Sequence, residues 1–125
     1  MIAGIGIDVV EVERIQKLLE KWGRRVTVRL FTEHEIAQCS SRREAAQCFA
    51  ARWAAKEALA KAVGHGWCSH FSWTDVEVSN DGAGKPALKI SGKTRQLVKN
   101  RNVFLSLTHT EAFAAAVVVV EAPAA

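Results

Sequence analysis

Two carboxylates in this chain lie among mostly apolar neighbours. Asp8 ends the run Gly4-Ile5-Gly6-Ile7-Asp8, and Glu57 lies in the run from Arg52 to Ala58. A buried carboxylate is costly unless it is paired, hydrogen-bonded or bound to a metal ion, so these two residues indicate a site. The structural alternative is that Asp8 caps the helix that follows it and that Glu57 pairs with Lys61 at i+4.

Basic side chains cluster between residues 14 and 29, where they outnumber a single acid: Arg14, Lys17, Lys21, Arg24, Arg25 and Arg29 against Glu20. The net charge of +4 and the isoelectric point near 9.2 favour an anionic partner. The cluster is typical of a docking surface for an acidic partner, although a solvated helix face has the same pattern. A small basic nucleic-acid-binding domain is the alternative function, but no aromatic platform is interleaved with the basic residues.

The elements at the N-terminus would position Asp8 and the basic cluster. Residues 2 to 10 are β-branched and glycine-rich, which predicts a buried strand that delivers Asp8 near its end. Two acids then favour a helix start, and Gly23 would end this helix. Its core-facing stripe has helical spacing and consists of Val12, Ile15, Leu19 and Trp22.

The longest predicted helix carries Glu57. Residues 32–35 match a capping box that opens a short helix through about Gln38, and residues 41–44 match a second one. From that second cap an alanine-rich run continues to Val63 without Gly or Pro, and Gly64 is placed to end it. Four side chains at intervals of four put Glu57 on the same side as two aromatic rings: Phe49, Trp53, Glu57 and Lys61.

The second half of the chain predicts strands joined by tight turns. Residues 71–79 and 86–90 would pair as a hairpin around the turn at 80–84, and a short helix is expected at 93–100. Residues 103–108 and 113–121 form two more strand candidates. Five strands and four helices in mixed order predict an α+β fold, with an antiparallel-rich sheet packed with one long and several short helices, in a single domain over residues 1–125.

Cysteine usage and hydropathy indicate a cytoplasmic protein. Cys39, Cys48 and Cys68 are odd in number and lack a paired metal spacing, so we expect reduced thiols. The apolar N-terminus has no basic region and reaches Asp8 too soon for a signal peptide. No run of about 18 apolar residues occurs, so no membrane span is predicted.

Three blocks of the sequence closely resemble those of holo-acyl-carrier-protein synthase (AcpS), a 4'-phosphopantetheinyl transferase family. They are Gly4 to Asp8, Arg52 to Ala58, and Ser106-Leu107-Thr108-His109-Thr110, in the family's order and spacing. The resemblance implies transfer of the 4'-phosphopantetheine group from coenzyme A to a serine of acyl carrier protein, with release of adenosine 3',5'-bisphosphate. It also implies that Asp8 and Glu57 bind the catalytic Mg²⁺, an ion that takes one or two carboxylates together with substrate phosphates. Either Glu57 or a water on the metal would accept the serine proton.

The resemblance assigns further residues to coenzyme A. Lys61, one turn after Glu57, would hold the pyrophosphate or assist proton transfer, and its ordinary pKa near 10.4 favours the phosphate role. His109, Thr110 and Arg52 would lie near the 3'-phosphate, because the planar fork of arginine suits phosphate oxygens. The remaining coenzyme A residues are Arg43, with Arg42 as an alternative, Ser106, and Gly64, which opens a Gly-x-Gly segment near the pantetheine.

The family's first helix docks acyl carrier proteins, which are acidic helical bundles. By the same resemblance, the docking residues here are Arg14, Lys17, Leu18, Lys21, Arg24 and Arg25. AcpS chains of this size form trimers with active sites between subunits, so a homotrimer is expected.

Overall fold

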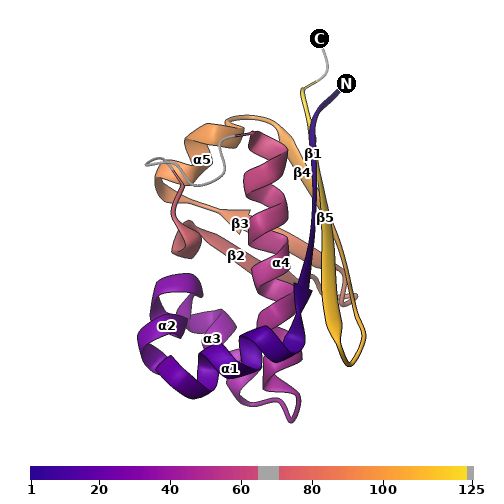
Figure 1. Ribbon diagram of the computed structural model, residues 1–125. Helices are drawn as coiled ribbons and strands as arrows, with labels where there is room; N and C mark the ends of the chain where they lie inside the picture. Colours follow the sequence, from indigo (N-terminus) through magenta and orange to yellow (C-terminus); the bar gives the residue numbers. More distant parts are fainter. Residues whose placement is uncertain (65–70, 124–125) are drawn as a thin grey trace.

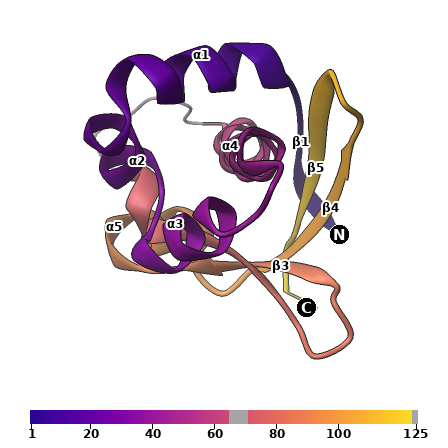
Figure 2. The same ribbon diagram turned by 90° about the horizontal axis from the view of Figure 1, so that it is seen from below.

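A computed structural model describes residues 1–64 and 71–123 of the chain. The long helix α4 (Ala45–Val63) runs along one face of a three-stranded sheet, and shorter helices and a two-stranded sheet surround the rest of it (Figures 1 and 2). The described residues contain five α-helices and five strands, and the strands pair antiparallel. The predicted α+β fold is therefore confirmed, with one helix more than expected.

The larger sheet has the order β1-β5-β4, formed by β1 (Ile2–Glu11), β5 (Phe113–Glu121) and β4 (Asn102–His109). In β5 every second residue is buried, as expected for a strand with one face on the core. No element of the described residues covers the other face of the sheet (Figure 2). In β1 this outer face carries Ile5, Ile7 and Val9, which are each about 60% exposed. The strand expected here is therefore present, but it is buried on one face only.

The smaller sheet is a hairpin of β2 (Val76–Asn80) and β3 (Pro86–Ile90), so the strands form two sheets rather than one. Asp81 closes the hairpin, because its Oδ1 accepts hydrogen bonds from the backbone N–H groups of Ala83 and Lys85. The predicted strand at 71–79 starts late, because residues 73–75 form a 3₁₀ turn, η1 (Trp73–Asp75). Helix α5 (Gly92–Val98) follows, and the Asp75 carboxylate accepts bonds from Thr94 near its start.

The helices at the N-terminal end follow the predicted boundaries closely. Helix α1 (Val12–Trp22) ends at Gly23, and α3 (Glu33–Ser40) begins with the predicted capping box of Thr32 and Glu35. Helix α2 (Arg24–Leu30) was not predicted, because Gly23 separates it from α1 without a longer loop. Trp22 is 45% exposed, so the predicted core stripe of α1 ends one turn earlier.

Helix α4 forms the centre of the core and reaches the predicted end. Gly64 adopts a left-handed φ of 77° there, and its N–H donates to the carbonyl of Lys61. The second predicted capping box is wrong, because α4 begins at Ala45, behind Glu44, without a side-chain cap. The hydroxyl of Ser41 instead donates to the carbonyl of Gln38 at the end of α3.

Two glycines let β1 lie directly against α4. A Cβ on Gly4 would collide with the carbonyl oxygen of Ala62, and a Cβ on Gly6 with that of Ala58. The alanines of α4 provide the matching flat surface, since their small side chains allow close approach. This contact places the next inward-facing residue of β1, Asp8, beside α4.

A disulfide bond joins Cys39 at the end of α3 to Cys48 in the first turn of α4, with Cα atoms 5.3 Å apart. The expectation of reduced thiols is therefore wrong for these two cysteines. The sequence separation of nine residues showed no recognisable pairing pattern, and only the packing of α3 against α4 brings the sulfur atoms together. Residues 65–70, which include Cys68 and most of the segment expected near the pantetheine, lie outside the described residues.

No helix of the described part of the chain is long and apolar enough to cross a membrane.

Candidate active site

Asp8, Glu57 and Lys61 come together where β1 passes α4. Lys61 Nζ lies 3.0 Å from Asp8 Oδ1 and donates a second hydrogen bond, of 3.1 Å, to the carbonyl of Ile7. The Asp8 side chain is only 15% exposed, whereas that of Lys61 is 54% exposed. The site therefore joins a carboxylate near the sheet to an ammonium group that reaches solvent.

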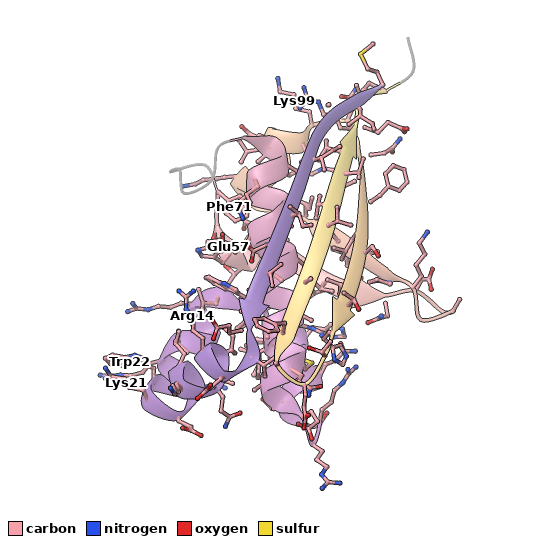
Figure 3. The ribbon with its side chains drawn as sticks, turned by 45° about the vertical axis from the view of Figure 1, so that its right-hand side comes forward. Arg14, Lys21, Trp22, Glu57, Phe71 and Lys99 are labelled. Carbon is pink, nitrogen blue, oxygen red and sulfur yellow. A yellow bond between two sulfur atoms is a disulfide. The ribbon has the colours of Figure 1, made fainter. Side chains whose placement is uncertain are left out.

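The electrostatic environment of Glu57 connects it to Asp8. Burial raises the pKa of Glu57, and the negative charge of Asp8 raises it further, while the positive charges of Lys61 and Arg14 act in the opposite direction. Glu57 and Arg14 lie on the same side of the molecule, where α1 approaches α4 (Figure 3). Two carboxylates that repel each other in a half-buried place favour a cation between them.

The structural alternatives for these residues do not hold. Glu11, rather than Asp8, occupies the N-cap position of α1, and no side chain caps this helix. The ion pair of Lys61 is made with Asp8 instead of Glu57.

The two carboxylates fit a Mg²⁺ ion. The described residues hold no group of three or more His, Cys, Asp or Glu side chains that could enclose a metal. A pair of carboxylate ligands is what Mg²⁺ uses when its other positions are left to water and substrate phosphates. The oxygen donors and the raised pKa of Glu57 agree with this kind of site.

Apart from the site of Asp8, Glu57 and Lys61, a hollow of about 260 Å³ is lined by Arg52, His109 and Arg42. We call it the Arg52–His109 pocket. His109 ends β4 on the face that points toward α4, and Arg52 projects from the second turn of α4. Burial lowers the pKa of Arg52, and the charge of Arg42 lowers it further, while Glu35 opposes both. Glu44 also lines the hollow, so three basic side chains face one acid there, a balance that still suits an anionic group.

The other predicted coenzyme A residues are not brought into this pocket within one chain. Arg42 lines it instead of Arg43. Ser106 lies on the opposite face of β4 from His109, since successive strand residues alternate between faces, and lines a different hollow beside the β2–β3 hairpin. The Thr110 hydroxyl accepts hydrogen bonds from Ala112 and Phe113 and so closes the β4–β5 turn. Gly64 ends α4, far along the helix from Arg52.

The predicted docking residues are exposed on α1 and α2, except for Leu18, which is half-buried. Lys21 lies over the ring of Trp22, and Lys17 pairs with Glu13 at 3.3 Å. A groove of about 570 Å³ lies between the two helices and is lined by apolar and basic side chains: Leu18, Trp22, Arg25, Val26, Val28 and Arg29. Figure 3 shows Arg14, Lys21 and Trp22 on the same side of the molecule as Glu57.

The sequence reasoning missed a fully buried ion pair. Lys56 Nζ donates to Glu35 Oε1 at 2.6 Å and to the carbonyls of Leu30 and Trp73, and neither charged side chain is exposed. Glu35 Oε2 accepts from the backbone N–H of Val78. The available signal was the position of Lys56 one turn after Arg52 in an alanine-rich helix, which places two cations on one buried stripe.

Comparison with known proteins places this geometry in a family. Residues 4–118 match the family model of the 4'-phosphopantetheinyl transferase superfamily. A holo-[acyl-carrier-protein] synthase of Trichlorobacter lovleyi is 45% identical, and the match covers 98% of this chain and 100% of that protein.

Two solved structures share the fold. The crystal structure of AcpS from Neisseria meningitidis has a TM-score of 0.90 at 33% identity and covers 98% of this chain and 100% of its own. The synthase from Bacillus anthracis, solved in complex with CoA (3',5'-ADP), has a TM-score of 0.84 at 40% identity, with coverage of 98% and 99%.

The chain belongs to the 4'-phosphopantetheinyl transferase superfamily, within its holo-acyl-carrier-protein synthases. The resemblance drawn from the three sequence blocks is confirmed. Family membership also decides between the two functional hypotheses in favour of the transferase over the nucleic-acid-binding domain.

Proposed function

We infer that this chain is an enzyme that transfers the 4'-phosphopantetheine group of coenzyme A to a serine of apo-acyl carrier protein. The serine oxygen attacks the phosphorus on the pantetheine side of the pyrophosphate, and the bond from this phosphorus to the bridging oxygen breaks. Adenosine 3',5'-bisphosphate leaves with the electron pair. The observation that carries this function is the convergence of Asp8, Glu57 and Lys61 from two elements in a chain of this family.

We propose that Asp8 and Glu57 hold Mg²⁺ and that Lys61 binds the pyrophosphate. When bound, the ion supplies positive charge against the negative charge that develops on the leaving phosphate. Lys61 reaches solvent while it is anchored on Asp8, so its ammonium can turn toward a phosphate at the same place. Glu57, or a water held by the ion, would accept the serine proton, as the family resemblance implies.

We propose that the Arg52–His109 pocket binds the 3'-phosphate of coenzyme A. The buried Nε of Arg52 has no hydrogen-bond partner among the described residues, and an unpaired buried donor is costly. Arg42 rather than Arg43 supports the phosphate here. Ser106 and Thr110 would contact coenzyme A only where the coenzyme A molecule is bound mainly by a neighbouring subunit.

We propose a homotrimer whose active sites lie between subunits. Arg52 and Glu57 are five residues apart on α4, and a helix turns by about 100° per residue, so they project about 140° apart. One copy therefore offers the metal pair and the Arg52–His109 pocket on different sides of α4. The uncovered apolar face of the larger sheet, with Ile5, Ile7 and Val9, supports burial against another copy.

We propose that α1 and α2 dock the acyl carrier protein. The basic side chains of the groove between them would meet acidic side chains of the partner, and its apolar side chains would be covered at the same time. The position of Arg14 close to Glu57 would bring the partner's serine to the metal pair.

We propose a cytoplasmic location. The disulfide between Cys39 and Cys48 does not support this location, because disulfides are rare in the cytosol. Family membership is its remaining support.

The function is tested by mass spectrometry of an apo-acyl carrier protein after incubation with the enzyme, coenzyme A and Mg²⁺. We expect a gain of one phosphopantetheine per carrier with the wild-type enzyme. We expect almost none with Asp8→Ala or Glu57→Ala, although both variants should fold. Full activity of either variant would contradict the metal assignment, and an unmodified carrier with wild-type enzyme would contradict the function.

A further inference from the structure

Arg52 is a buried cation that forms no ion pair with a carboxylate among the described residues. Only 4% of it is exposed. The nearby acid, Glu35, already accepts hydrogen bonds from Lys56, Thr32 and the backbone of Val78. The positive charge of Arg52 is therefore left available for an anion that enters the Arg52–His109 pocket.

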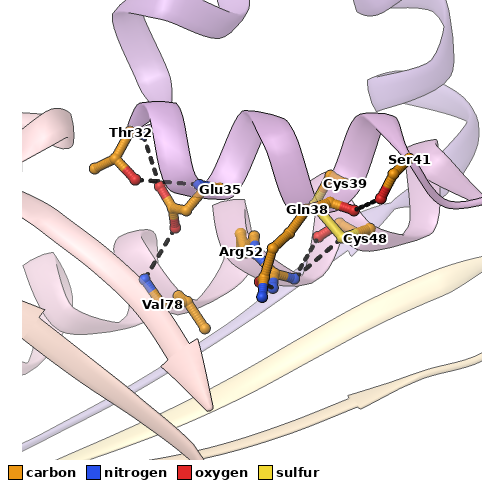
Figure 4. The surroundings of a disulfide bond; sticks show 8 residues. All are labelled: Thr32, Glu35, Gln38, Cys39, Ser41, Cys48, Arg52 and Val78. Carbon is orange, nitrogen blue, oxygen red and sulfur yellow. Dashed lines mark hydrogen bonds between the residues drawn. A yellow bond between two sulfur atoms is a disulfide. The ribbon is translucent and has the colours of Figure 1, made fainter.

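The guanidinium is nevertheless held in place by neutral acceptors (Figure 4). Its Nη2 donates to Gln38 Oε1 at 2.9 Å, and its Nη1 lies 3.2 Å from Cys48 Sγ and 3.5 Å from the carbonyl of Cys48. Gln38 precedes Cys39, so the disulfide fastens the Gln38 end of α3 to the turn of α4 that carries Cys48. The guanidinium of Arg52 is thus held between Gln38 of α3 and Cys48 of α4, two segments that the disulfide links.

Gln38 can fix the position of the Arg52 guanidinium without neutralising its charge. An arginine side chain has many rotamers, and part of this freedom is lost on binding if the group was free before. Because the amide oxygen of Gln38 already fixes the guanidinium in the folded protein, the freedom of the Arg52 side chain is lost on folding and not on ligand binding. Its positive charge is kept. A carboxylate at the same position would pair with Arg52 and compete with a phosphate.

We propose that Gln38 is a positioning residue that aims Arg52 at the 3'-phosphate and so sets how strongly the enzyme prefers coenzyme A to dephospho-coenzyme A. The inference rests on the proposed function of the Arg52–His109 pocket. Gln38 acts through Arg52 and does not touch the substrate.

The test compares Gln38→Met, which keeps the length of the side chain but removes the acceptor, with Gln38→Glu. We expect Gln38→Met to raise the KM for coenzyme A about three- to tenfold, with kcat and the KM for dephospho-coenzyme A unchanged. Gln38→Glu should raise the KM for coenzyme A more, because its carboxylate competes for Arg52. Calorimetric binding of adenosine 3',5'-bisphosphate, compared with adenosine 5'-monophosphate, should show the same selective loss without any turnover.

Two controls separate positioning from a structural effect. Gln96→Met makes the same chemical change at an exposed position of α5 and should alter neither KM. In the Arg52→Ala background Gln38→Met should have no further effect, because residues that act as a unit are non-additive. If Gln38→Met does not fold, Gln38→Asn replaces it, since its shorter side chain keeps the amide but cannot reach Arg52.

Equal changes for both donors, no change, or additivity with Arg52→Ala would each overturn the role of Gln38. The failure of the proposed pocket would look different. In that case the wild-type enzyme would bind the two adenosine nucleotides alike, and Arg52→Ala would have no effect on either donor.

Discussion

At the scale of single residues, the raised pKa of Glu57 links the active site to stability. Burial and the charge of Asp8 raise this pKa, so the folded protein binds a proton at Glu57 more strongly than the unfolded chain does. The resulting stabilisation is present below the ordinary glutamate pKa and is lost as the pH rises through the raised value. Above that value, the charged Glu57 opposes folding in the metal-free protein.

We therefore expect Glu57→Gln to raise the melting temperature of the metal-free protein at about pH 8 and to change it little at about pH 4. Added Mg²⁺ should raise the melting temperature of the wild-type protein but not that of the variant, because a ligand stabilises only a state that binds it. Thermal scans at both pH values measure these effects. A melting temperature of Glu57→Gln below wild type at the higher pH would contradict this reasoning.

The buried pair of Lys56 and Glu35 predicts a large effect on stability. Burial lowers the pKa of Lys56, and the carboxylate of Glu35 opposes this shift, so each charge depends on the other. Lys56→Met leaves Glu35 buried without its cation and should cost about 3–5 kcal/mol of unfolding free energy. The double variant Lys56→Met with Glu35→Gln should cost less than the single one. Urea denaturation measures both, and a single-variant cost below about 1 kcal/mol would place the pair among ordinary surface ion pairs.

At the scale of elements, α1 and α2 form the proposed docking surface. Reversing Arg14 and Lys21 to Glu should raise the KM for acyl carrier protein strongly and leave the KM for coenzyme A almost unchanged, because such charges act mainly on association. Wild-type affinity for the carrier should also fall as salt reduces the Debye length below about 10 Å, and the double variant should be less sensitive. The matched control reverses Lys93 and Arg95, which are exposed on α5. A wild-type KM that is independent of salt would argue for a solvated helix face instead.

The disulfide between α3 and α4 should contribute measurably to the stability of the fold. A disulfide that closes a loop with a sequence separation of nine residues stabilises the fold by about 2–3 kcal/mol, through the entropy of the unfolded chain. A thiol reductant should lower the melting temperature of the wild-type protein. It should leave that of the double variant Cys39→Ala and Cys48→Ala unchanged, and a wild-type protein insensitive to reductant would show that the bridge does not form.

At the scale of the whole molecule, the placement of the two half-sites predicts complementation between subunits. Asp8→Ala and Arg52→Ala subunits are each impaired alone, but a mixed oligomer contains sites in which Asp8 and Arg52 are both intact. Random mixing in equal amounts should restore about a quarter of the wild-type sites, measured at low coenzyme A concentration. Light scattering of the same samples gives the mass of the assembly. A monomer, or a mixture no more active than its parts, would contradict shared sites.

Much of the local structure could be predicted from the sequence. The start of α3, the end of α4 and the bounds of β5 followed from a capping box, a glycine and a run of strand-forming residues, which act over a few positions. Asp8 and Glu57 were recognisable because a carboxylate in an apolar run is costly to bury unless it is paired, hydrogen-bonded or bound to a metal ion. These signals are local, so the sequence alone determined most of the elements and which residues they carry, but not α2 or η1.

Only the tertiary structure decided what these elements do together. The contact of Gly4 and Gly6 with α4 sets Asp8 against Lys61, and the packing of α3 on α4 creates the disulfide, the Lys56–Glu35 pair and the grip of Gln38 on Arg52. Ser106 and His109 are close in sequence but lie on opposite faces of β4, because strand residues alternate. Each of these depends on contacts between residues distant along the chain or on which face of an element meets a neighbour. Side-chain periodicity shows that such faces exist, but not which partner packs against each of them.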